Sequence, residues 1–320
     1  MWLRGDCHLH TARSHDAVLT PAQIVGEARA AGLDFVVPTE HGLLTRRSDW
    51  SSSEGLLIVP GREHLSSGGH WLTIGSAWAA DTDGMARRHD ASPVRDPGAL
   101  TVAAHPHAPY ATGAFARGFD EVDGIEVWNG PWTSGRPWQA DNEQALADWA
   151  ERLATAPRTI ATGGSDAHLP GDVGAPQSVV RLARRAPAAV VEGLIHGRSW
   201  IASGSATGLR LRIRGSRSVA EIGDAVALDP GAQLELVVHG VAGGRFTVLD
   251  RHGPIASDRI GDDRLRRSIP LPDRDGRFVR VEVRHADCSM AALSNPILLD
   301  RPDAEGSATA LEVRSPPAAR

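Results

Sequence analysis

The chain has 320 residues, a formal net charge of −5 and two cysteines. This length allows one large domain or two smaller ones, each with a proper hydrophobic core, so no disulfide framework is required. The interspersed charges and the lack of an apolar run of roughly 20 residues exclude a basic nucleic-acid binder and a membrane-spanning protein. The few cysteines and the polar N-terminus predict a cytoplasmic protein.

Short apolar runs, each followed by a polar cluster, recur through the first half of the chain. Their apolar cores lie at residues 2–3, 34–37, 56–59, 100–104, 124–127 and 159–162. Runs of this length between Gly and Pro are typical of buried parallel strands. Helical patterns fall at residues 20–32, 141–153 and 186–196. This alternation predicts an α/β fold with its active site at the C-terminal ends of the strands.

The hydrophobic pattern changes to a period of two after about residue 204. Alternating segments at 209–214, 233–238 and 278–283 are separated by Gly, Asp and Pro. This pattern predicts a small antiparallel β-sandwich. We therefore expect an α/β domain at 1–205, a β-sandwich domain at 206–300, through which an oligomer could form, and a flexible tail at 301–320.

Eleven of the 14 histidines precede residue 200, and several of them follow an apolar run. His8 and His10 are two residues apart at the end of the first run, so their side chains face the same way on a strand. Asp166 and His168 repeat this arrangement. Imidazole and carboxylate ligands together suit Zn, Mn or Fe better than a soft thiolate site.

Five further candidate ligands follow from position in the chain. They are Asp16, His41, Glu63, His70 and His105. Asp16 is preferred to its neighbour His15 as the metal ligand, although the sequence alone gives little ground to choose between them. Cys7 faces away from His8 and His10 and is expected in the core. Nine ligands are enough for two or three divalent ions.

The ordered motifs DCHLHT, SHD, TEHG, GREHLSSGGH, AHPH and GGSDAH resemble those of the PHP (polymerase and histidinol phosphatase) metallohydrolases. The resemblance covers about residues 1–205 and implies a distorted seven-stranded (β/α) barrel of the PHP type with a two- or three-metal site. It implies that Glu63 bridges two metals and that His70 and His105 bind the second. Glu40 departs from the aspartate usual before His41, which affects the surroundings of the ligands rather than metal binding.

Three later segments are similar to the carbaryl-hydrolase-like (CehA/McbA-type) branch of that family. They read GIEVWNG, GLIHGRSWIASGS and LSNPILL. Some members of this branch hydrolyse carbamates, but the branch is broad and does not fix a substrate.

The predicted chemistry is hydrolysis by a metal-bridged hydroxide, because a water between two divalent ions loses a proton near neutral pH. Three carboxylates against two or three dications leave the site positive, which favours a small anionic phosphate ester. Asp166 is expected to orient the water and His107 to transfer a proton. The candidate substrate-binding residues are Arg62, Tyr110, Trp128 and Asn129, with Trp132 completing an aromatic wall.

Two alternatives remain open at this point. The first is a carbamate, amide or ester hydrolase that uses the same metal site. The second is a non-catalytic domain that keeps its metals for structure or binding. All nine ligand positions are filled, which argues against the second alternative. The absence of lysine excludes a binuclear site bridged by a carboxylated lysine.

Overall fold

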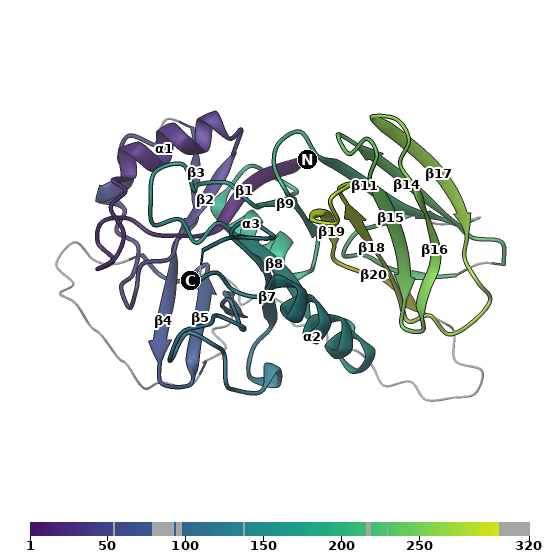
Figure 1. Ribbon diagram of the computed structural model, residues 1–320, viewed down its shortest axis with the longest axis horizontal. Helices are drawn as coiled ribbons and strands as arrows, with labels where there is room; N and C mark the ends of the chain where they lie inside the picture. The colour runs from purple at the N-terminus through teal and green to yellow at the C-terminus, as the bar shows by residue number, and fades with distance from the viewer. Residues whose placement is uncertain are drawn as a thin grey trace, which may run out of the picture.

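The computed structural model describes residues 1–53, 55–78, 93, 98–136, 138–215, 219–228 and 230–300. In this part of the chain the strands form three sheets, accompanied by three α-helices (Figure 1). The protein thus has a mixed α/β fold with few helices. No described helix is both long and apolar enough to cross a membrane. The predicted tail at 301–320 lies outside the described residues.

The first sheet contains the strand that carries His8. Its N-terminal members are β1 (Trp2–Leu9), β2 (Phe35–Pro38), β3 (Leu57–Ile58), β9 (Gln177–Arg181) and β10 (Ser199–Ala202). β1, β2 and β3 are parallel, as the apolar runs predict, whereas β9 is antiparallel to both β1 and β10. The parallel strands end at the same edge, and this edge carries His8.

The second sheet supplies the opposite wall of the site. It consists of β4 (Gly61–Ser66), β5 (Gly69–Ile74), β6 (Leu100–Ala103), β7 (Gly124–Asn129) and β8 (Ile160–Gly164). β6, β7 and β8 are parallel, and β4 and β5 form an antiparallel hairpin. Isolated bridges between His41 and Glu63 and between Leu9 and Ala167 join this sheet to the first at two places. The two sheets therefore curl around a common interior.

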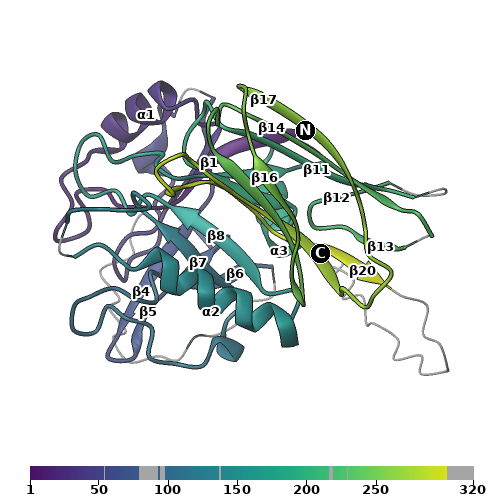
Figure 2. The same cartoon turned by 45° about the vertical axis from the view of Figure 1, so that its right-hand side comes forward.

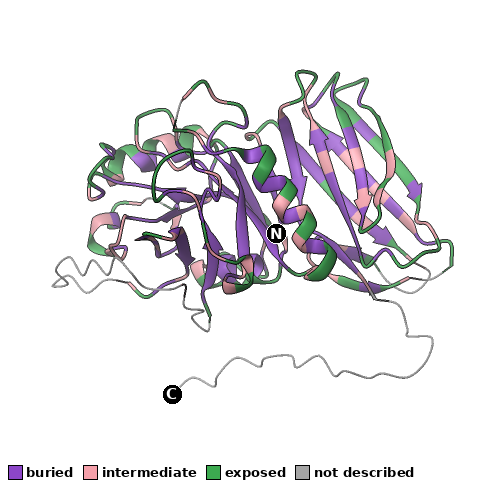
Figure 3. Ribbon diagram, turned by 60° about the horizontal axis from the view of Figure 1, so that its bottom comes forward, coloured by how far each residue is buried: buried purple, intermediate pink, exposed green. Residues whose placement is uncertain are grey.

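Three α-helices cover these sheets. They are α1 (Pro21–Ala30), α2 (Asn142–Thr155) and α3 (Pro187–Ile195), close to the predicted ranges. Thr20 and Gln23 form a capping box that starts α1, and Asp141 caps α2. α2 turns one apolar side inward and leaves its outer side exposed (Figure 3). Because the described chain also contains antiparallel strands and connections without helices, the seven-stranded (β/α) barrel stays a prediction.

The C-terminal region contains two facing layers of strands (Figure 2). One layer has the order β12 (Val219–Glu221), β11 (Gly208–Arg214), β14 (Gln233–His239) and β17 (Arg264–Pro270). The other contains β13 (Ala225–Ala227), β15 (Arg245–Asp250), β16 (Gly253–Arg259), β18 (Phe278–Arg284), β19 (Met290–Ser294) and β20 (Ile297–Asp300). A single apolar core lies between the layers. The predicted strands at 209–214, 233–238 and 278–283 correspond to β11, β14 and β18.

Hydrogen bonding crosses the predicted domain boundary at residue 205. β10 pairs with β19, so that the second C-terminal layer continues the first sheet. The buried side chain of Asn295 also accepts from the Ala161 N–H at 2.8 Å and donates to the Ala161 carbonyl at 2.9 Å. The division into domains 1–205 and 206–300 and the separate β-sandwich therefore stay predictions.

Candidate metal centre

His8 and His10 lie at the C-terminal end of β1, and both are fully buried. The Nε2 atom of His8 is 3.2 Å from Asp166 Oδ1 and 3.4 Å from Glu63 Oε2. The Nε2 atom of His10 is 3.1 Å and 3.3 Å from the same two oxygens. The predicted pair His8 and His10 therefore contacts Asp166 of the second predicted pair, Asp166 and His168.

Glu63 is the central carboxylate of the site and is fully buried. Its Oε1 atom is 2.9 Å from His70 Nδ1 and 3.0 Å from His105 Nε2. Its Oε2 atom is 3.1 Å from His41 Nε2. The sequence placed Glu63 at the end of the strand around 56–59, but it lies inside β4, because the hairpin of β4 and β5 brings its two strands across the cavity.

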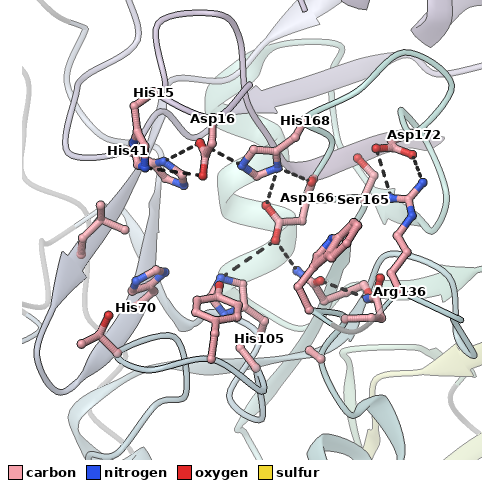
Figure 4. Close-up of a pocket in the computed structure, with 18 of the residues that line it drawn as sticks. His15, Asp16, His41, His70, His105, Arg136, Ser165, Asp166, His168 and Asp172 are labelled. Atoms are coloured by element: carbon pink, nitrogen blue, oxygen red, sulfur yellow. Dashed lines mark hydrogen bonds and ion pairs between the residues drawn. The ribbon is translucent and has the colours of Figure 1, made fainter. Parts of the chain in front are cut away.

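Asp16, His41 and His168 form the outer part of the site (Figure 4). Asp16 Oδ1 is 3.2 Å from His41 Nδ1 and 3.4 Å from His168 Nε2. The rings of His15 and His41 have their centroids 5.1 Å apart. His15 and Asp16 are thus both within reach of His41, and the preference for Asp16 stays a prediction that its closer contacts favour.

The candidate ligands form overlapping sets, and within each set the ligand atoms lie within 4.8 Å of one another. The sets are His8, His10, Glu63 and Asp166; Glu63, His70 and His105; His10, His41 and His168; and His15, Asp16 and His41. Glu63 belongs to the first two. A carboxylate shared in this way has one oxygen for each of two ions, which is the donor arrangement of a bridged metal pair.

The electrostatics of the cluster fit bound cations. Burial alone would raise the pKa of the Glu63 and Asp166 carboxyls, but the neighbouring histidines hold the pKa of both well below the usual range. The ring centroid of His10 is 4.3 Å from that of His41 and 4.4 Å from that of His168. Imidazoles this close repel one another when protonated, whereas neutral imidazoles around a metal ion do not.

Glu126 of β7 is a buried carboxylate that the sequence analysis missed. Its Oε1 atom is 2.9 Å from His8 Nδ1, which leaves His8 Nε2 facing the site. Its Oε2 atom accepts from the His105 backbone N–H at 2.8 Å and from Asn129 Nδ2 at 3.0 Å. A carboxylate on the far nitrogen of a ligating histidine fixes its tautomer and orientation. A charged residue inside the apolar run GIEVWN was the signal that could have revealed it.

Asp6 of β1 is a second buried carboxylate that the sequence analysis missed. It accepts from the backbone N–H groups of Ser165 and Gly174, each at 2.9 Å, and burial raises its pKa to about 6 against these hydrogen bonds. Asp166 follows Ser165 and has a φ of +51°, in the left-handed region. Its N–H donates to the His8 carbonyl at 2.8 Å. Asp6 therefore helps to hold Asp166 in an unfavourable backbone conformation.

Glu40 supports His10 through Ser14. The Ser14 hydroxyl donates to Glu40 Oε2 at 2.8 Å and lies 3.1 Å from His10 Nδ1. The Thr11 hydroxyl donates to Glu40 Oε1 at 2.6 Å. Glu40 thus has the supporting position that the sequence comparison with aspartate implied, and it is not among the described ligand sets.

The cluster lies at a cavity of about 790 Å³, which brings together only some of the predicted substrate residues. Tyr110 and Asn129 line this cavity. His107, predicted to transfer protons, instead places its Nε2 atom 2.6 Å from Asp148 Oδ2 on α2, because the chain turns at Pro106. It is not among the lining residues, so its role in proton transfer stays a prediction that this placement does not support.

Arg62 and Trp128 also lie outside the cavity lining. Arg62 adjoins Glu63 in β4, and successive side chains of a strand face opposite sides. Trp128 is buried and packs edge-on against Trp132, with ring centroids 5.0 Å apart. The predicted aromatic wall of Trp128 and Trp132 is therefore part of the core beside α2.

Comparisons with known proteins give one match to a family model and several similar proteins. Residues 147–199 match a family model described as PHP-associated. This segment includes Asp166 and His168. An uncharacterised protein of Methanocaldococcus jannaschii is 27% identical over 142 residues, which are 40% of this chain and 82% of that protein.

Several solved structures are similar to the chain. A two-domain protein from Bacteroides vulgatus, described as containing a predicted PHP-like metal-dependent phosphoesterase, is 15% identical with a TM-score of 0.49, covering 93% of this chain and 95% of that one. A lesion-specific endonuclease from Pyrococcus furiosus is 15% identical with a TM-score of 0.42, covering 62% and 56%. An amidohydrolase from Chromobacterium violaceum is 17% identical with a TM-score of 0.38, covering 61% and 96%.

Proposed function

We propose that the chain is a metal-dependent hydrolase of the PHP type that acts as a phosphoesterase on a small anionic phosphate ester. One observation carries the proposal. Glu63 belongs to two ligand sets at once, and both sets lie at a cavity of about 790 Å³. A cavity of this size accommodates a small molecule. These sets of His and carboxylate ligands suit two or three divalent ions of Zn, Mn or Fe.

The residues of the site are proposed to bind the ions and to orient a water molecule. His8, His10 and Asp166 would bind one ion, His70 and His105 a second, and Glu63 both. Bound divalent ions would supply an activated water and stabilise negative charge on the ester. Asp166 has its carboxylate at the first set, beside Asn129 Nδ2 at 3.2 Å, and is placed to orient that water.

Charge favours a phosphate ester as the substrate. The proposed ligands Asp16, Glu63 and Asp166 contribute three negative charges, fewer than the positive charges of two or three dications. Glu40 and Glu126, buried behind the ligands, offset part of this excess, but they do not occupy the cavity side of the ions. An anionic group is therefore attracted to the loaded site. The same ions would also polarise the carbonyl of a carbamate, and the segments that resemble the carbaryl-hydrolase-like branch keep this alternative in the test.

The test is a substrate panel on protein loaded with Mn, Zn or Fe. We expect hydrolysis of p-nitrophenyl phosphate or bis-p-nitrophenyl phosphate, its loss after treatment with a chelator, and its return when the metal is restored. Hydrolysis of 1-naphthyl methylcarbamate alone would replace the phosphoesterase by the carbamate hydrolase. Less than one metal per chain, with no ester hydrolysed after any metal is added, would instead favour the non-catalytic domain.

A further inference from the structure

Large apolar side chains gather at the mouth of the cavity. Tyr110, Trp138 and Leu169 are 41%, 57% and 44% exposed, and all three line it. They come from the connections that follow β6, β7 and β8. Exposed apolar groups that cluster at one hollow mark a binding surface, whereas scattered ones carry no such meaning. These three apolar side chains therefore indicate that part of the molecule that binds in the cavity is apolar.

Tyr110 faces the second ligand set. Its ring centroid is 6.2 Å from that of His70 and 6.1 Å from that of His105. The ring lies so close to Gly113 that a Cβ on this glycine would overlap it, which limits its freedom to move. A phenol has a reference pKa of about 10 and is uncharged near neutral pH. Tyr110 thus presents an uncharged, held aromatic surface next to the proposed metals.

The charges of the lining, apart from the proposed ligand sets, cancel each other. Among the described lining residues these are Arg136 and Asp172. Arg136 Nη2 donates to Asp172 Oδ1 at 2.8 Å and its Nη1 to Oδ2 at 3.4 Å. Figure 4 shows the pair across the cavity from His41 and His70. The guanidinium therefore has a carboxylate already in place where a substrate anion would bind.

This ion pair also connects the segments that carry two of the apolar groups. Arg136 lies two residues before Trp138, and Asp172 Oδ2 accepts from the Leu169 backbone N–H at 3.4 Å. The pair consequently joins the segment that carries Trp138 to the segment that carries Leu169. Its position supports a role in shaping the apolar wall rather than in binding an anion.

We propose that the cavity selects esters whose non-reacting part is uncharged and aromatic, held between Tyr110, Trp138 and Leu169. The inference rests on the proposed function, because the phosphate would be bound by the metals. An aromatic ring gains by leaving water against these side chains. A second negative charge on the substrate would have to compete with Asp172 for Arg136, the cationic side chain of the described lining.

The test measures binding of phosphonates, which are not hydrolysed, to the Mn-loaded full chain by calorimetry. We expect phenylphosphonate to bind about tenfold or more tightly than methylphosphonate. We also expect 3-phosphonopropionate, which carries a second charge, to bind no more tightly than methylphosphonate. Equal affinity for the phenyl and methyl compounds, or tightest binding of the carboxylated one, would overturn the inference.

A pair of variants locates the preference on this wall. Trp138→Ala should reduce the phenyl preference about fivefold or more and leave methylphosphonate affinity unchanged. Trp2→Ala, which removes another exposed tryptophan away from the cavity lining, should change neither value. An unchanged preference in Trp138→Ala would contradict the assignment.

The two levels of the argument fail separately. If no phosphonate binds but 1-naphthyl methylcarbamate is hydrolysed with a KM raised by Trp138→Ala, the phosphoesterase proposal is wrong and the proposed aromatic selectivity of the cavity stands. If phosphate esters are hydrolysed with no preference for aromatic ones, the phosphoesterase proposal stands and the proposed aromatic selectivity is wrong.

Discussion

The two halves of the molecule use their interiors differently. Before residue 205, buried carboxylates surround buried histidines, and Asp6, Glu40, Glu63 and Glu126 are all hidden from solvent. After it, a large apolar core fills the space between two strand layers. The buried charges described there, Asp250 and Arg280, have partners in Arg274 at 2.7 Å and Glu282 at 2.6 Å. Buried polar groups stabilise little unless they are fully satisfied.

Among the described residues, the candidate metal site lies in the first half only, whereas apolar cores lie in both halves. We expect substitutions of the proposed ligands to remove metal and activity, and substitutions in the C-terminal core to lower the free energy of unfolding without removing metal. Contacts across the boundary, such as Arg280 over the Trp149 ring at 5.0 Å, limit how cleanly the two separate.

The largest effect is expected from Glu63→Gln. Loss of the carboxylate shared by two ligand sets should lower kcat/KM by about 10⁴-fold, or about 5 kcal/mol, and reduce the bound metal. Elemental analysis and the phosphate-ester assay measure both. Glu192→Gln, an exposed carboxylate on α3, is the matched control. Full activity in Glu63→Gln would contradict the proposal that Glu63 binds the metals in the first half of the chain.

Leu236→Ala tests the other half. Leu236 of β14 is fully buried in the C-terminal core, and a cavity there should lower the free energy of unfolding by about 2–5 kcal/mol. Urea unfolding gives this value. Val237→Ala, at the next and less buried position, should cost far less. Metal content per folded chain should stay constant, and its loss in Leu236→Ala would show that the halves are not separable.

Glu126→Gln sharpens the comparison within the first half. It keeps the shape of the side chain but weakens its hold on His8 Nδ1, so metal affinity should fall about 10–100-fold. Competition with a chromophoric chelator measures the affinity. Glu151→Gln, exposed on α2, serves as the control. Unaltered affinity would leave Glu126 with only a packing role.

The smallest effect is expected at the junction. Arg284 Nη1 is 2.6 Å from Glu143 Oε1 of α2, but the Glu143 carboxylate is largely exposed. Exposed pairs contribute little, so Arg284→Ala should cost less than about 1 kcal/mol. A double-mutant cycle with Glu143→Ala isolates the pair. A coupling of about 2 kcal/mol or more would mean that the halves depend on this contact.

Local signals in the sequence predicted the elements well. The helical patterns at 20–32, 141–153 and 186–196 and the alternation in β11, β14 and β18 depend on neighbours in the chain, and these ranges agree with the structure. His8 and His10 follow β1 of the first sheet, and Asp166 and His168 follow β8 of the second, so their convergence agrees with a site at strand C-terminal ends.

What the sequence did not predict depends on contacts between distant segments. Glu63 lies inside a hairpin strand, and Glu126 faces the site from the middle of β7. His107 follows a candidate ligand by two residues, yet the turn at Pro106 directs it to α2. Spacing alone cannot distinguish these cases, because each is decided by a partner far along the chain.

The pairing of β10 with β19 has a consequence for anyone who shortens the protein. A chain cut after residue 205 would keep every proposed metal ligand but lose β19, and the hydrogen-bonding groups of β10 on that side would lose their partners. Open edges of this kind pair readily with other copies. The isolated first half is therefore expected to aggregate, even though it keeps all the proposed metal ligands.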